Sequence, residues 1–272
     1  MWADLGWALV TDAISTLVVL PAVTLLVLFV LRVGPSLRIW GVRSSFLLPF
    51  GARNAPTVVI STGSFQENPN YPRGRPQTGT GQVFAIAAIS PSIVAAYRTV
   101  IEHDRLRMSE DCDLADPLFQ GDLITIGGPK TNEVTRVLLE KIDLPVGYGF
   151  ETATLENGTT VDCIRWADAP VTPGPQEALG LVIRCANPLG RAGVLTVLAG
   201  VGTFGTEAAA VALAGLSDLR PMRAALSHQR AGFIALVGAR TEEHSSGISQ
   251  VHKPFIKGHR KQIPWRREPT CR

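Results

Sequence analysis

A stretch without charged side chains near the N-terminus is the feature that most constrains this chain. Residues 13–31 contain no Asp, Glu, Lys or Arg. Because an α-helix rises about 1.5 Å per residue, a helix of this length spans a hydrocarbon core of about 30 Å. Pro21 lies inside the stretch, which a transmembrane helix tolerates when the freed backbone groups find other partners. The sequence therefore predicts a short extracytoplasmic N-terminus at residues 1–12 and one transmembrane helix at residues 13–33, in contact with the lipid bilayer.

A cleaved secretory signal is the alternative interpretation of this stretch. Such a signal begins with basic residues and ends at a small-residue cleavage site. Here the preceding residues include Asp4 and Asp12 and no basic residue, and Gly34-Pro35 follows the stretch. The pattern favours an uncleaved membrane anchor.

The charges on either side of the anchor predict its orientation. Four arginines follow the uncharged stretch without an acidic residue among them: Arg32, Arg38, Arg43 and Arg53. Because basic residues mark the cytoplasmic end of a membrane helix, we expect the C-terminal bulk of the chain in the cytoplasm. Four cysteines without a CxxC pair fit a reducing compartment and offer no zinc spacing. Residues 34–56 are expected to form a juxtamembrane linker, lying along the lipid headgroups or starting the next domain.

The C-terminus is also basic. Residues 246–272 are expected to form a tail, in which seven lysines and arginines from residue 253 onward stand against Glu268 alone. Contact between residues 253–272 and anionic lipid is one interpretation, and a solvated tail without a partner is the other. Residues 54–252 carry more acidic than basic side chains, which argues against a nucleic-acid-binding protein.

Short β-branched runs alternate with helical patterns between residues 57 and 245. The expected strands are 57–61, 123–126, 161–166, 181–185, 194–198 and 233–237. The expected helices are 82–100, which Ser90-Pro91 should break or restart, 132–142, and 207–214 with an extension toward residue 226. Alternating strands and helices predict a cytosolic α/β domain, Rossmann-like, with a mostly parallel sheet and helices on both faces.

The glycine-rich loop at residues 200–205 reads G-x-G-x-x-G between an expected strand and an expected helix. Glycines let the backbone approach a phosphate, and the helix amides and dipole attract the anion. In a dinucleotide-binding site, an acidic residue about 20 residues after the motif binds the ribose. Here that position falls near Asp218, before any second strand, which argues against a standard dinucleotide-binding site. Close packing of helix on sheet is the alternative use of the glycines. The expected ligand-binding residues are Gly200, Gly202, Thr203, Gly205 and Thr206.

A second glycine loop, at residues 127–132, also lies between a strand and a helix. We expect ligand contacts from Gly127, Gly128 and Asn132. A purely structural loop, in which Thr131 caps the helix, is the alternative. Lys130 reaches a phosphate only if its ammonium group points inward.

The loop that follows the first strand, at residues 61–81, is longer than an ordinary connection, which suggests a functional loop. Its arginines are planar donors suited to phosphate or carboxylate. A flexible, solvated loop is the alternative. The expected ligand-binding residues here are Gly63, Ser64, Arg73 and Arg75.

These motifs, taken together, resemble a known family. The resemblance is carried by Gly63-Ser64, Asn68-Pro69-Asn70-Tyr71, Gly127-Gly128, and Ala199-Gly200-Val201-Gly202-Thr203 with Glu207 nearby. Their order is similar to that of the Lonely Guy phosphoribohydrolases and the wider SLOG superfamily, over roughly residues 57–210. The resemblance implies a Rossmann-like fold in which the three loops form a pocket for a nucleotide or nucleotide-derived ligand. Membrane-tethered SLOG-like domains are thought to sense nucleotide signals in bacterial conflict systems.

The resemblance also implies a catalytic role for Glu207. The chain departs from the family pattern because Leu198-Ala199 replaces Pro-Gly, Glu207 lies one residue late, and no arginine matches the catalytic arginine.

Three functions follow as alternatives. The first is a single-pass membrane protein whose cytosolic domain binds a nucleotide-derived ligand and acts as a sensor. The second is a hydrolase that cleaves an N-glycosidic or phosphate-containing substrate with Glu207 as its acid, and the third is a non-catalytic scaffold. The five histidines make no HExxH motif, so no metal site is predicted, and no cofactor besides the suspected nucleotide is assigned.

Overall fold

The computed structural model describes most of the chain after residue 54. The described ranges are 55–68, 71–97, 100–142, 144–155, 158–190, 193–214, 231–243 and 249–264. The predicted anchor at 13–33 and nearly all of the linker lie outside them. Within these ranges, no helix is both long enough and apolar enough to cross a membrane.

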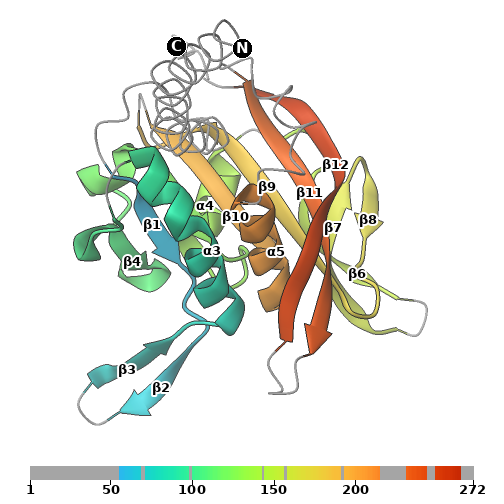
Figure 1. The fold of residues 1–272 in the computed structure, drawn as a ribbon, viewed down its shortest axis with the longest axis horizontal. Coiled ribbons are helices and arrows are strands. Elements are labelled where there is room, and N and C mark those ends of the chain that lie inside the picture. The colour runs from blue at the N-terminus through green and yellow to red at the C-terminus, as the bar shows by residue number, and fades with distance from the viewer. Residues whose placement is uncertain are drawn as a thin grey trace, which may run out of the picture. The chain divides into compact units, whose positions relative to one another are not determined.

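A seven-stranded sheet forms the centre of the domain (Figure 1). In spatial order its strands are β12 (Ser249–Pro264), β11 (Ala231–Glu243), β9 (Glu177–Ala186), β10 (Val194–Val201), β5 (Leu123–Ile126), β1 (Thr57–Ile60) and β4 (Leu106–Met108). Strands β10, β5, β1 and β4 are parallel neighbours, whereas β9 is antiparallel to both β10 and β11, and β12 is antiparallel to β11. Five of the seven strands therefore run in one direction, because β11 regains the direction of β10.

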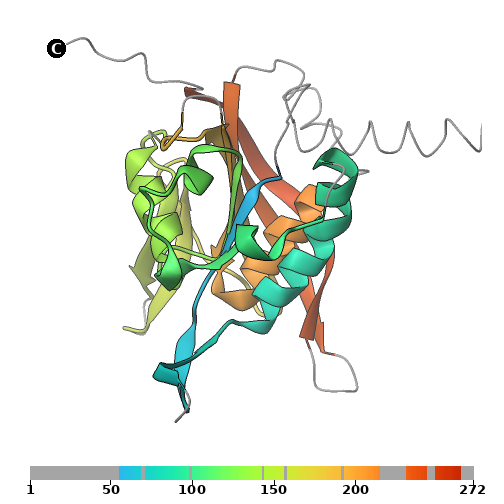
Figure 2. The same cartoon turned by 90° about the vertical axis from the view of Figure 1, so that its left-hand side faces the viewer.

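Helices cover both faces of this sheet, as the sequence predicts (Figure 2). Helices α3 (Thr80–Tyr97) and α5 (Gly202–Ala214) pack on one face. Helix α4 (Glu133–Lys141) packs on the other face, beside a three-stranded sheet of β6 (Gly149–Thr154), β7 (Thr160–Trp166) and β8 (Ala169–Val171). The α/β class is thus confirmed.

The central strands are buried on both faces, which explains why their sequences are mostly apolar and hold no charged residue. Every residue of β1 and β5 is buried. Successive side chains of a strand point to opposite faces, so Val58 joins the core under α3 and α5 while Val59 joins the core under α4. The same alternation separates Leu198 from Val197 in β10.

Several elements differ from the sequence predictions. Residues 249–264, expected in a basic tail, form β12, because they complete the edge of the sheet by pairing with β11. Part of the long first loop forms a hairpin of β2 (Ser64–Asn68) and β3 (Tyr71–Gln77), which projects from the domain (Figure 1). The strand expected at residues 161–166 belongs to the small sheet.

Helix α3 also differs from its prediction, because it continues through Pro91 instead of breaking there. The proline ring lies on the exposed side of the helix. In the turn before it, the Ser90 hydroxyl donates a hydrogen bond to the Ile86 carbonyl at 2.7 Å. A proline removes one backbone donor and can be accommodated by a local bend.

A buried charge network joins α3 to the strands. Arg184 on β9 is only 1% exposed and interacts electrostatically with Tyr97 and Asp122. Asp122 accepts hydrogen bonds from the Tyr97 hydroxyl at 2.9 Å and from the Val194 backbone N–H at 2.8 Å. Burial lowers the pKa of Arg184 to about 10, and the neighbouring Tyr97 and Asp122 oppose that shift. One carboxylate therefore ties together α3, β9 and β10.

This network predicts a large stability effect for Asp122→Ala. The substitution removes two hydrogen bonds and the favourable electrostatic interaction of the Asp122 carboxylate with the buried Arg184, so the free energy of unfolding should fall by about 3 kcal/mol. The measurement is urea unfolding of the full-length chain in detergent. Asp104→Ala, at an exposed position on the short helix η2 (His103–Arg105), is the control and should change stability by less than about 0.5 kcal/mol. Equal losses in the two variants would contradict the role assigned to Asp122.

Candidate functional site

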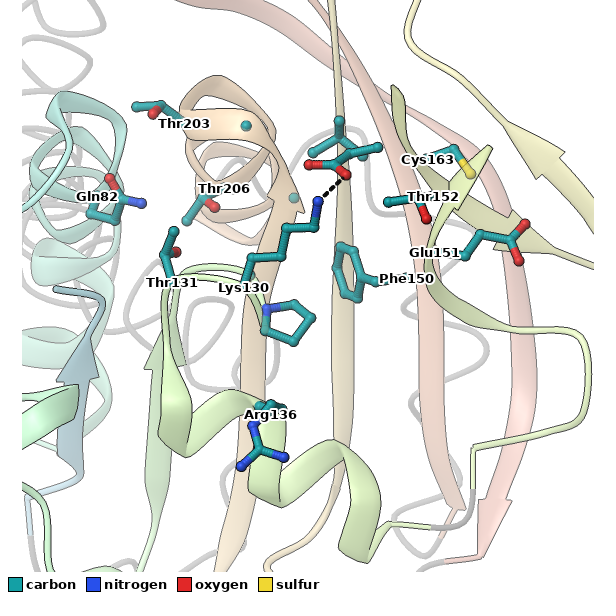
Figure 3. A pocket seen from close by; sticks show the side chains of 16 residues that line it. Gln82, Lys130, Thr131, Arg136, Phe150, Glu151, Thr152, Cys163, Thr203 and Thr206 are labelled. Atoms are coloured by element: carbon teal, nitrogen blue, oxygen red, sulfur yellow. Dashed lines mark hydrogen bonds and ion pairs between the residues drawn. The ribbon is translucent and has the colours of Figure 1, made fainter. Parts of the chain in front are cut away.

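Two of the glycine loops lie side by side at the edge of the sheet where β5 and β10 end. The Gly127 N–H donates to the Leu198 carbonyl at 2.9 Å, and a Cβ on Gly128 would lie 3.1 Å from the Gly200 carbonyl oxygen. A pocket of about 450 Å³ opens at this edge (Figure 3). It is lined by Gln82, Gly128, Pro129, Lys130, Thr131, Arg136, Phe150, Glu151, Thr152, Asp162, Cys163, Gly200, Val201, Gly202, Thr203 and Thr206.

The G-x-G-x-x-G segment forms no separate loop, because β10 continues to Val201 and α5 begins at Gly202, not at residue 207 as predicted. Each of its glycines has its own structural role. Gly202 has φ +66°, a conformation that favours glycine, and is the first residue of α5. A Cβ on Gly200 would overlap the backbone of Gly205, and a Cβ on Gly205 would overlap the carbonyl oxygen of Leu179 on β9. Close packing therefore accounts for Gly200 and Gly205, and Gly200 also lines the pocket.

The N-terminus of α5 faces the pocket. Gly202, Thr203 and Thr206, all in the first turns of this 13-residue helix, line the pocket. The first N–H groups of a helix have no partner within the helix, and together with the helix dipole they attract anions. Figure 3 shows Thr203 and Thr206 at the end of the helix, on the side opposite the β6 side chains Phe150 and Thr152. This end of the pocket is suited to a negatively charged group.

Two buried polar atoms at the same end have no hydrogen-bond partner. Thr206 is 1% exposed and its Oγ1 is unpartnered, and Gln82 is 6% exposed and its Oε1 is unpartnered. Leaving a buried polar atom unsatisfied costs about 1–3 kcal/mol. Both residues line the pocket, and the two unpartnered atoms are buried in its wall.

The loop at 127–132 is built by Gly127 and Asn132. Gly127 has φ +119°, a conformation that favours glycine, and a Cβ there would lie 2.7 Å from the Cβ of Ser61. A larger residue at this position would therefore clash with the residue that follows β1. The buried Asn132 caps α4, because its Oδ1 accepts from the Thr135 N–H at 3.0 Å, while its Nδ2 donates to the Ile126 carbonyl at 3.1 Å. Asn132, and not Thr131, is thus the cap residue, and Thr131 lines the pocket instead.

Charged side chains on the pocket wall form ion pairs. Lys130 pairs with Asp162 of β7, and both residues line the pocket. Arg136 pairs within its own helix, with the Glu140 carboxylate at 2.7 Å and with Glu133. On the small sheet, Glu151 accepts a hydrogen bond from Arg165 Nε at 2.6 Å.

Several residues predicted to bind the ligand do not line the pocket. Gly127, Asn132 and Gly205 serve the loop and helix contacts described above, and Gly63 lies after β1, where its N–H donates to the Gln77 carbonyl at 2.7 Å. Ser64 is on β2, and Arg73 and Arg75 are on β3. The side chains of these three hairpin residues lie outside the described part of the structure.

The proposed catalytic acid, Glu207, is also turned away from the pocket. Its side chain is buried, and its Oε1 accepts a hydrogen bond from the Val251 N–H of β12 at 3.2 Å. Thr206, one position earlier on α5, lines the pocket and Glu207 does not. The catalytic assignment loses its geometric basis, because successive helical residues lie about 100° apart around the axis.

The far wall of the pocket could not be predicted from motifs. Phe150, Glu151 and Thr152 come from β6, where they pair with Ile164, Cys163 and Asp162 of β7. These strands carry no glycine motif and lie in a separate sheet, so only the tertiary structure brings them to the glycine loops. The alternation of polar and apolar residues in β7 indicates a strand with one exposed face, which is a weak sequence signal for this wall of the pocket.

The groups of the pocket offer little nucleophilic chemistry. Burial raises the pKa of the Cys163 thiol, and the nearby Glu151 and Asp162 carboxylates add to the shift. Because the thiolate is the nucleophilic form, Cys163 is a weak nucleophile at neutral pH. Among the described residues, no group of three or more His, Cys, Asp or Glu side chains is arranged to hold a metal ion.

No family model matches this chain, and no curated protein sequence matches it. By its fold and site, it is an α/β protein with a pocket built from two glycine segments, a helix N-terminus and a small antiparallel sheet.

The raised pKa of Cys163 predicts slow alkylation. At pH 8 the folded full-length chain should modify Cys163 with iodoacetamide at least about tenfold more slowly than the chain in urea, because the unfolded thiol regains a pKa near 8.5. Peptide mass spectrometry measures the modification at this cysteine separately from the others. Equal rates in the folded and unfolded chain would show that Cys163 is an accessible thiolate.

Proposed function

We propose that this protein binds a nucleotide or nucleotide-derived ligand through its phosphate at the N-terminus of α5. The observation that carries the proposal is the buried, unpartnered Thr206 Oγ1 on the pocket wall, in the first turns of a helix that begins with a glycine of positive φ. A helix N-terminus alone is a common structural feature. An unsatisfied hydroxyl on a residue that also lines the pocket is what supports an occupant here, since the equally unpartnered Thr135 hydroxyl at the start of α4 does not line it.

The phosphate is bound by groups that come from two elements. The backbone N–H groups of Gly202 and Thr203 and the hydroxyls of Thr203 and Thr206 lie at the end of α5. Gln82, in the first turn of α3, adds an amide whose NH₂ group donates hydrogen bonds and whose Oε1 accepts them from a ribose hydroxyl.

The rest of the ligand occupies the apolar part of the pocket. Pro129, Phe150 and Val201 line this part, and Figure 3 shows the Phe150 ring facing the glycine-loop side. A planar ring stacks favourably on an aromatic side chain. The volume of about 450 Å³ lies within the range of about 300–1,000 Å³ that is typical of small-molecule sites. A nucleobase with its ribose phosphate fits this combination of an apolar wall and an anion-binding end.

The described residues favour binding over turnover. Glu207 contacts β12 and Cys163 is held as a thiol, while the two carboxylates on the pocket wall, Glu151 and Asp162, are each paired with a cation. We therefore propose a sensor whose domain lies on the cytoplasmic side of an anchor at residues 13–33 and transmits occupancy to that helix or to a partner. The resemblance to the SLOG superfamily supports this proposal.

The test is a thermal-stability screen of the full-length chain in detergent. The panel contains AMP, NAD, ADP-ribose, cyclic nucleotides and inorganic phosphate. A ligand at about 100 times its Kd adds about 2.7 kcal/mol of stability, which gives a clear shift in Tm. A folded protein that responds to none of these compounds would contradict the proposal and favour the scaffold. Release of a free base or phosphate from a stabilising compound would favour the hydrolase.

Removal of one hydroxyl tests where the ligand binds. Thr206→Val keeps the side-chain shape and removes the hydroxyl, so affinity for the stabilising nucleotide should fall about tenfold, the loss expected for one hydrogen bond to a charged group. Titration calorimetry of the full-length chain measures the change. The stability of the empty protein should be unchanged or higher, because an unsatisfied buried atom is removed.

A matched control is available at Thr135. Its hydroxyl is also buried and unpartnered, but it lies on α4 and does not line the pocket. Thr135→Val should therefore leave the affinity unchanged. If both variants bind as tightly as the unmodified chain, Thr206 does not contact the ligand and the proposed site is wrong.

A further inference from the structure

The Lys130–Asp162 ion pair joins opposite walls of the pocket. Lys130 belongs to the glycine loop that precedes α4, and Asp162 belongs to β7 of the small sheet. The side chains are 65% and 40% exposed, respectively. Figure 3 shows Lys130 reaching from the glycine loop toward the β6 side chains, with its ammonium group at the dashed contact. The pair therefore lies on the pocket wall and is exposed to solvent.

This pairing differs from the others on the pocket wall. Arg136 is paired with carboxylates of its own helix, and Glu151 is paired with Arg165 within the small sheet. Among the described residues on the wall, Lys130 is thus the cation whose ion-pair partner comes from another element and also lines the pocket.

Three physical facts make this pair exchangeable. An exposed ion pair is weak, because water screens it and two long side chains lose freedom. A lysine ammonium sits on a flexible four-carbon stem and donates in three directions, so it can change partner. A phosphate carries more negative charge than a carboxylate and offers more acceptor oxygens, so it competes well for the ammonium group.

We propose that Lys130 exchanges Asp162 for the phosphate of the incoming ligand, so that Asp162 acts as an internal competitor for the site. In the empty protein the carboxylate occupies the cation and closes the loop at 127–132 onto β7. Ligand binding opens this contact and separates the glycine loop from the small sheet. The inference rests on the proposed function, and it adds the regulation of that same site.

A double-mutant cycle on the full-length chain in detergent tests the exchange, with AMP and adenosine as probes in titration calorimetry. Asp162→Asn should bind AMP about threefold more tightly, because the competitor for Lys130 is removed. Lys130→Met should bind AMP about tenfold more weakly. In the Lys130→Met background, Asp162→Asn should give no gain in AMP affinity, because the ammonium group for which the Asp162 carboxylate and the phosphate compete is absent. Adenosine, which lacks the phosphate, should respond to none of the changes.

Glu151→Gln is the matched control for net charge. It also removes one negative charge from the pocket wall, but its carboxylate pairs with Arg165 and not with Lys130. It should leave AMP affinity within about twofold of the unmodified chain. A gain equal to that of Asp162→Asn, or a gain from Asp162→Asn that persists without Lys130, would show a general charge effect and overturn the exchange.

The outcomes separate this inference from the function on which it rests. If the unmodified chain and Asp162→Asn both fail to bind AMP, the proposed phosphate site fails and the exchange fails with it. If the unmodified chain binds AMP and Asp162→Asn binds it no more tightly, the site stands and the exchange is wrong.

Discussion

The approach of α5 to the sheet is the constraint on which the site depends. Gly180 of β9, Gly200 of β10 and Gly205 of α5 meet at backbone distance, and a Cβ on any of the three would overlap a neighbouring backbone atom. No other residue type permits this contact. It fixes the first turn of α5 at the end of β10, and this position brings the helix N–H groups and Thr206 to the pocket. The glycines that pack the helix therefore also place the anion-binding end.

Electrostatics divide the domain into a buried network and an exposed one. At the amino end of β5, Asp122 holds α3, β9 and β10 together around the buried Arg184. At the carboxyl end, the Lys130–Asp162 pair is exposed to solvent. Removing the partner of a buried charge strongly destabilises the fold, whereas an exposed ion pair exchanges partners with little loss of free energy. The first network suits a fixed scaffold and the second suits a ligand site.

Much of the fold could be predicted from the sequence, because local patterns carry it. The runs at β1, β5 and β10 are mostly apolar and uncharged, as is typical of strands buried on both faces, and glycines mark where β5 and β10 end. The antiparallel direction of β9 and the joining of β12 to the sheet could not be predicted in this way. Pairing partners are chosen by contacts between residues far apart in the chain, and β12 is rich in lysine and arginine like a solvated tail.

The sequence by itself determined the strands, the glycine segments and the presence of a helix at the second of them, since each depends on backbone conformation and nearest neighbours along the chain, although α5 begins at Gly202 and not at residue 207. Only the tertiary structure decided which side chains form the pocket. It turned Glu207 toward Val251, used Asn132 as a helix cap, and brought Phe150 and Asp162 from a separate sheet. The physical reason is that the direction of a side chain depends on the packing of its whole element, and one residue of shift along a helix changes the face that it occupies.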